Sequence, residues 1–167
     1  MIRSIIWTAL FSIIAGILQS TIRGSHPFLS IVPDIALCIV VYSAYVNGTM
    51  PGQVSGFFSG LLLDFLSAAP MGINCFVRTI IGAFTGLFKG AFFLDYIFMP
   101  AILCAIATIM KAALIFVIYL LMPSSVEINT YSFTNSTFWI ELGLNTLFAP
   151  VLFLLLRKFR PILVGKG

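Results

Sequence analysis

The amino-acid sequence predicts an all-α integral membrane protein: a compact bundle of about six transmembrane helices forming a single domain over residues 1–167. Two observations support this. Hydrophobic residues make up 60% of the 167 positions and charged residues only 8%, whereas soluble domains carry roughly 25% charged residues. The apolar residues also fall into stretches near the roughly 20 residues that cross a bilayer as a helix. A chain of this composition suits lipid rather than water.

Six apolar stretches are separated by polar residues or by proline and glycine. In chain order the predicted spans are residues 4–22, 28–46 or 33–46, 51–66, 71–88, 96–122 and 136–156. The first has no cleavage pattern, so we expect a retained span rather than a signal peptide. The second and third are short, which predicts tilting, shielding by neighbours or a partly re-entrant path.

The basic residues predict the orientation. Four of the nine basic residues crowd the last eleven positions: Arg157, Lys158, Arg160 and Lys166. With six spans both termini share one side of the membrane, together with Arg3 and Lys89. The excess of positive charge on cytoplasmic sides then places both termini in the cytoplasm and the polar loop 123–135 outside.

Small residues recur at four-residue spacing in three of the spans. They are Ser12, Gly16 and Ser20 in the first span, Gly52, Gly56 and Gly60 in the third, and Gly82 and Gly86 in the fourth. Such spacing lets two helix backbones approach closely in lipid. Two interpretations stay open: packing within this protein, or a surface for the transmembrane helix of another protein.

Five ionisable residues lie inside or at the start of apolar spans, where an unpaired charge is costly. They are Asp34, Asp64, Arg78, Lys111 and Glu141. The short turn between the third and fourth spans predicts an Asp64–Arg78 contact. Lys111 is expected to meet a carboxylate, with Glu141, Asp34 and Asp64 as candidates. This buried polar network either holds the bundle together or serves a function such as an ion path.

The remaining residues show no pattern typical of a catalytic or metal site. Cys38, Cys75 and Cys104 lie in apolar stretches without close spacing, and His26 is the single histidine. The chain has no Gly-x-Ser-x-Gly nucleophile motif, and its basic tail lacks interleaved aromatics. We therefore expect no enzymatic activity, no cofactor, no metal and no nucleic-acid partner.

Residues 33–90 carry a resemblance to a known family. Pro33 and Asp34 open an apolar span, a glycine-rich span ends in three leucines and Asp64, and a short turn ends in Pro70, Met71 and Gly72. This order resembles the MreD family of rod-shape-determining proteins, which are small proteins of the bacterial inner membrane. The family is also similar in layout to the S components of energy-coupling-factor transporters.

The resemblance implies a non-enzymatic scaffold of the machinery that builds lateral peptidoglycan. It implies a multi-pass protein of the bacterial inner (cytoplasmic) membrane that contacts membrane lipids and binds MreC. Through MreC it implies indirect partners: a cell-wall glycosyltransferase, a transpeptidase and MreB. The alternative is a vitamin-binding S subunit, which needs a roomy pocket lined by aromatic and polar groups. The sequence has 17 phenylalanines but only two tryptophans, and the polar residues of the hairpin formed by the third and fourth spans are able to satisfy one another, which favours the scaffold.

Overall fold

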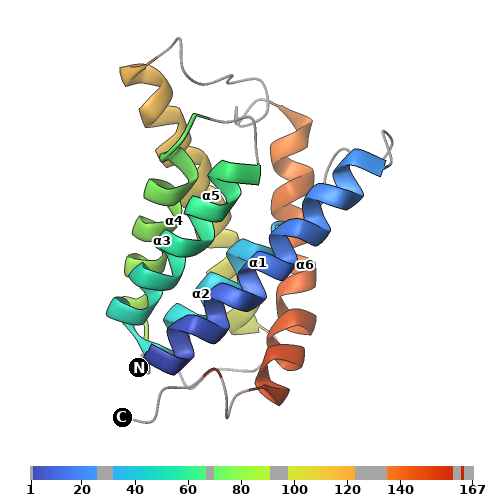
Figure 1. Ribbon diagram of the computed structural model, residues 1–167. Helices are drawn as coiled ribbons and strands as arrows, with labels where there is room; N and C mark the ends of the chain where they lie inside the picture. Colours follow the sequence, from blue (N-terminus) through green and yellow to red (C-terminus); the bar gives the residue numbers. More distant parts are fainter. Residues whose placement is uncertain are drawn as a thin grey trace.

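The computed structural model describes residues 2–25, 32–66, 70–90, 98–122, 135–159 and 163, and this part of the chain is all-helical. Its six helices are α1 (Ile2–Ser25), α2 (Ile35–Asn47), α3 (Thr49–Leu66), α4 (Ile73–Leu87), α5 (Phe98–Leu121) and α6 (Ser136–Lys158). They alternate in direction, so α1 begins and α6 ends at the same end of the bundle (Figure 1). The predicted six-helix bundle is confirmed, with helix boundaries within three residues of those expected when the second span is taken from residue 33.

Three of the helices are long and apolar enough to cross a membrane: α1 over Ile5–Ile22, α5 and α6. Helices α2 and α4 are apolar but have only 13 and 15 residues. At 1.5 Å per residue a helix of 13 residues is about 20 Å long, less than the roughly 30 Å of hydrocarbon. The predicted shortness of the second span is therefore a property of the fold, and α2 needs shielding by its neighbours.

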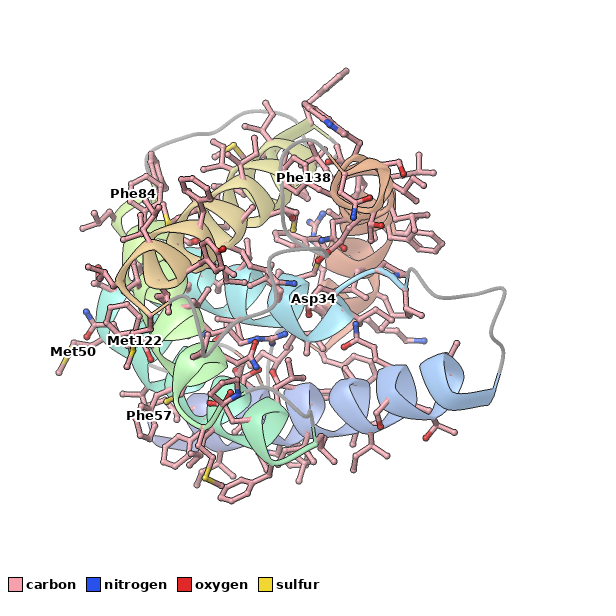
Figure 2. All side chains as sticks on the ribbon, turned by 90° about the horizontal axis from the view of Figure 1, so that it is seen from above. Asp34, Met50, Phe57, Phe84, Met122 and Phe138 are labelled. Atoms are coloured by element: carbon pink, nitrogen blue, oxygen red, sulfur yellow. The ribbon has the colours of Figure 1, made fainter. Side chains whose placement is uncertain are left out.

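Helix α2 receives that shielding because it lies at the centre of the bundle. Its residues from Ala36 to Ala44 are all buried, and it packs against each of the other five helices. A helix that is apolar on every side is stable only when surrounded. Figure 2, viewed along the bundle, shows α2 inside the ring of other helices, with Asp34 at its start. The outer helices turn large apolar residues outward, including Phe57, Leu147 and Val151, as a lipid-facing surface requires.

Helices α3 and α4 form the closest pair in the bundle, and glycine makes this approach possible. A Cβ added to Gly52, Gly56 or Gly60 would lie closer than 3.0 Å to a carbonyl oxygen of α4, belonging to Gly82, Arg78 and Asn74 respectively. Gly82 and Gly86 are equally crowded by the backbone of residues 48–52. The structure thus places both glycine stripes in contact with each other, within the protein.

At the end of the bundle where α1 begins, Asn47 joins three segments. Its side-chain amide donates to the backbone carbonyl oxygen of Leu163 at 2.9 Å. Its backbone carbonyl oxygen accepts from Lys89 Nζ at 2.9 Å. Leu163 is also buried, so this residue beyond the end of α6 is anchored on the bundle. Gly48, with φ of +99°, lets the chain reverse between α2 and α3 while the Lys89 side chain lies across it.

Candidate functional site: a buried charged cluster

Asp34 lies at the centre of the buried polar residues because the sequence starts α2 there. Pro33 and Asp34 precede the first turn, and one carboxylate oxygen of Asp34 accepts from the backbone N–H of Leu37 at 3.0 Å. An acidic N-cap satisfies an otherwise unpaired donor and interacts favourably with the helix dipole. Because α2 is short, this N-cap is inside the bundle, and Asp34 is buried.

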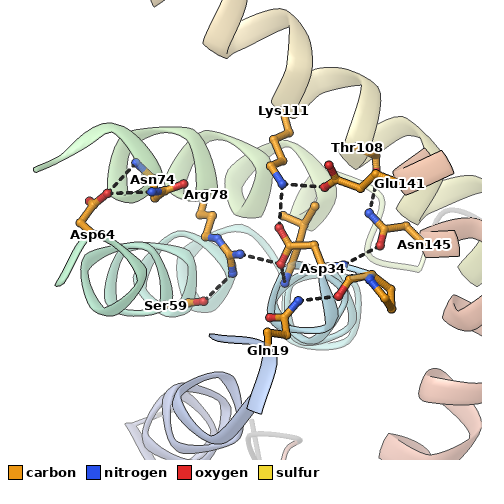
Figure 3. Close-up of polar contacts among 12 residues, drawn as sticks. Gln19, Asp34, Ser59, Asp64, Asn74, Arg78, Thr108, Lys111, Glu141 and Asn145 are labelled. Carbon is orange, nitrogen blue, oxygen red and sulfur yellow. Dashed lines mark hydrogen bonds and ion pairs between the residues drawn. The ribbon is translucent and has the colours of Figure 1, made fainter. Parts of the chain in front are cut away.

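Two cations meet the Asp34 carboxylate. Arg78 Nη2 of α4 lies 2.6 Å from one oxygen, and Lys111 Nζ of α5 lies 2.9 Å from the other. Lys111 also lies 2.7 Å from Glu141 of α6. We call these four residues the Asp34 cluster (Figure 3). The two negative charges of the acids and the two positive charges of the bases cancel. This is the expected arrangement for ionised groups removed from water.

Neutral side chains complete the hydrogen bonds of the Asp34 cluster. Arg78 Nη1 donates to Ser59 of α3 at 2.9 Å. The backbone N–H of Asp34 donates to the fully buried Asn145 of α6 at 2.7 Å, and Asn145 donates to Thr108 of α5 at 3.0 Å. Gln19 of α1 donates to the carbonyl oxygen of Pro33. All six helices therefore contribute to this region.

These four neutral residues were not predicted from the sequence. Asn145 could have been predicted from the sequence, because a side-chain amide in an apolar span is costly to bury without hydrogen-bond partners. Thr108 precedes Lys111 by three positions and so shares its helix face. Ser59 and Gln19 carried no signal that separates them from other small or polar residues of the apolar spans.

The predicted Asp64–Arg78 contact is wrong, because Arg78 pairs with Asp34 and Asp64 has other partners. Asp64 accepts from the backbone N–H groups of Gly72, Asn74 and Cys75 at 3.0, 3.0 and 3.1 Å, and from the Asn74 amide at 2.9 Å. The start of α4 lies beside the end of α3, so N–H groups that have no partner within α4 reach the Asp64 carboxylate. Asp64 therefore caps its neighbour, and Arg78 reaches inward to α2 instead.

Replacing Asp64 by leucine is expected to destabilise the protein by about 2 kcal/mol, the upper part of the range for losing a helix N-cap. The matched variant Asp64→Asn keeps an acceptor oxygen and should lose less. Hydrogen exchange of the first turn of α4, measured on the purified protein in detergent, checks this. Unchanged exchange in Asp64→Leu would show that the cap contributes nothing.

The structure also places the small residues of α1. Ser12 and Gly16 face the bundle, with a Cβ on Gly16 lying 3.7 Å and 3.8 Å from methyl groups of Leu63 and Leu66 on α3. Ser20 is exposed and donates to the carbonyl oxygen of Ile17. Of the predicted stripe on this helix, two members thus pack inside the protein and one faces outward.

Among the described residues, no group of three or more His, Cys, Asp or Glu side chains could hold a metal ion. The carboxylates of Asp34 and Glu141 are bound to cations, and that of Asp64 to N–H groups. His26, most of the predicted outer loop, and the side chains of Arg3, Arg23, Arg160 and Lys166 lie outside the described residues. The arrangement of the described charges therefore joins helices together.

Comparison with known proteins gives one match. The family model described as rod shape-determining protein MreD matches residues 1–159 of the 167. No curated protein and no solved structure matches the chain. The family match covers the glycine hairpin, all four residues of the Asp34 cluster and the whole of α6. The chain therefore belongs to the MreD family of rod shape-determining membrane proteins.

Proposed function

We propose that this protein is a non-enzymatic scaffold of the cell-elongation machinery, which binds the transmembrane helix of MreC and helps to organise the enzymes that synthesise lateral peptidoglycan. The observation that carries the proposal is the match to the MreD family over residues 1–159. MreB and the cell-wall glycosyltransferase and transpeptidase are then indirect partners, reached through MreC.

The way the polar groups are used supports a scaffold. The charges of the Asp34 cluster neutralise one another, and the glycines of α3 and α4 are covered by each other's backbones. What these helices offer to other molecules is their outward surface, formed by residues such as Ile14, Phe57, Ile106 and Val151. Van der Waals packing on such a surface associates helices in lipid. The partner helix is therefore expected on an outer face and not on the glycine stripes.

We also propose that both termini lie on the cytoplasmic side of the inner membrane, with six membrane-crossing segments. Helix α1 begins and α6 ends at one end of the bundle (Figure 1), and the exposed cations Lys89, Arg157 and Lys158 are at that end. Excess positive charge marks the cytoplasmic side. Labelling of a cysteine introduced at Lys158 only from the cytoplasmic side would agree; labelling from the periplasm would contradict it.

Photo-crosslinking in growing cells tests the proposed partner. A photoreactive amino acid is placed singly at Ile14, Phe57, Ile106 and Val151, which are exposed on α1, α3, α5 and α6. The control position is Val40 on the central helix, which is fully buried. We expect a crosslink to MreC from at least one exposed face and none from Val40.

Two results would contradict the scaffold. One is the absence of an MreC crosslink from all four exposed positions when each variant still supports rod shape. The other is a vitamin that copurifies in a one-to-one ratio with the protein, which would instead support an S subunit of an energy-coupling-factor transporter.

A further inference from the structure

Helix α1 is attached to the bundle differently from the other five helices. Ion pairs or charged hydrogen bonds of the Asp34 cluster join α2, α3, α4, α5 and α6. The hydrogen bonds that join α1 side chains to α2 and to Pro33 before it include Thr8 with Ser43 at 2.9 Å and Gln19 with the carbonyl oxygen of Pro33, and both are between neutral groups. Gly16 meets α3 at ordinary van der Waals distance, whereas the glycines of α3 and α4 are in backbone contact. Helix α1 is therefore not part of the charged network that joins the other five helices.

Two buried polar atoms mark the inner face of α1. Ser12 Oγ and Gln19 Oε1 are the buried side-chain oxygen atoms without a hydrogen-bond partner in the described part of the chain. Ser12 as a whole is only 3% exposed. A buried hydroxyl without a partner is unfavourable, so the observed position of α1 leaves polar groups that a different position could satisfy.

The four-residue spacing of small residues on α1 allows one such alternative position of the helix. Thr8, Ser12, Gly16 and Ser20 repeat every four residues, so a movement by one helical turn replaces each small residue by another small residue. Four residues correspond to about 6 Å along the helix. After this movement Ser12 has the place of Thr8 beside Ser43.

We propose that α1 is a movable helix with a second register on a fixed five-helix core, in which Ser12 replaces Thr8 as the partner of Ser43. Packed elements change between discrete arrangements by steps of this kind, and one-turn shifts have been described for other proteins. The step moves Gln19 away from the carbonyl oxygen of Pro33, which directly precedes Asp34, and so couples α1 to the Asp34 cluster. A partner that pulls on α1 or binds its outward face would change which register α1 occupies. It would thereby change the contacts of α1 with the five-helix core.

The aromatic contacts of α1 favour the observed register. Phe11 packs on Phe159 beyond α6, with ring centroids 5.5 Å apart, and on Trp7 of its own helix at 6.4 Å. In the second register Ala15 takes the place of Phe11 and the contact with Phe159 is lost. Phe11→Ala should therefore increase the population of the second register, and Ser12→Ala should decrease it.

Distances between pairs of spin labels, measured in lipid nanodiscs, test the proposal. Labels at Leu18 of α1 and Leu87 at the end of α4, both exposed, report the movement without altering the inner face of α1. The native cysteines Cys38, Cys75 and Cys104 are buried. The control pair is Phe65 on α3 with Leu147 on α6. Both side chains are exposed, and both helices belong to the fixed unit formed by α2 to α6.

We expect two Leu18–Leu87 distances that differ by several ångström, with the shorter one at least about twofold more populated in Phe11→Ala and reduced in Ser12→Ala. The Phe65–Leu147 distance should stay single in all variants, which shows that the core is folded. A single Leu18–Leu87 distance that neither substitution changes, with the control pair intact, would overturn the proposal.

Discussion

Replacement of Asp34 by leucine is expected to lower the free energy of unfolding by about 3–5 kcal/mol, the range for removing one partner from a buried ion pair. Asp34 is the anion that Arg78 and Lys111 share, and all of these side chains are buried. Without it the Arg78 guanidinium keeps Ser59 as its side-chain partner among the described residues, and the first turn of α2 loses its N-cap. The thermal unfolding midpoint of the purified protein in detergent measures the effect.

A double variant and a control make this experiment specific. Asp34→Leu combined with Arg78→Leu removes one of the two stranded cations, so part of the lost stability should return. Lys158→Gln removes a charge of the same magnitude from an exposed position, where substitutions usually change stability by less than about 0.5 kcal/mol. If Asp34→Leu unfolds at the same temperature as Lys158→Gln, the Asp34 cluster does not hold the bundle together.

Replacement of Gly56 by leucine is the second change with a large expected effect. Even the first carbon of a side chain at this position would overlap the carbonyl group of Arg78, so α3 and α4 must separate. Overpacking of a well-packed interior costs about 1–3 kcal/mol or more. Because α4 carries Arg78, the separation should also disturb the Asp34 cluster. We expect a lower yield of folded protein and a loss of rod shape in cells that depend on the variant.

Gly143 on α6 provides the matched control. It is exposed, and a Cβ added there has no atom within 4 Å. Gly143→Ala should be neutral or stabilise α6 by about 0.5–1 kcal/mol through the better helix propensity of alanine. Gly56→Ala, which adds the same single carbon, should destabilise. Equal yields and unfolding midpoints for these two alanine variants would show that the close contact of α3 with α4 contributes little.

The two experiments address different parts of the proposed scaffold. The Asp34 cluster fixes where five helices meet, and the glycine contact fixes how closely two of them approach. Neither the Asp34 cluster nor the glycine contact has a group on the outer surface of the bundle. They therefore affect a partner helix only by determining the shape of that surface. A substitution on that surface, such as at Phe57 or Val151, would instead change partner binding and leave stability nearly unchanged.

Much of the fold followed from the sequence because hydropathy is a local property. The excess of apolar residues predicted the membrane, and polar, proline and glycine breaks predicted six helices close to their observed ends. Four-residue glycine spacing indicated where backbones meet, since only glycine lets two helices approach so closely. The same reasoning named Asp34, Arg78, Lys111 and Glu141 as buried charges, because an ionised group in an apolar span is costly without a partner.

The tertiary structure alone decided which of these residues meet. Asp34 is 44 positions from Arg78 and 77 from Lys111, and no local pattern relates residues so far apart. The prediction that paired Asp64 with Arg78 used the shortest connection, but the N–H groups that open α4 lie nearer to Asp64. Asn145 and Thr108 became part of the site because α5 and α6 pack side by side. The sequence thus determined which groups need partners, and the packing of six helices around α2 determined the partners.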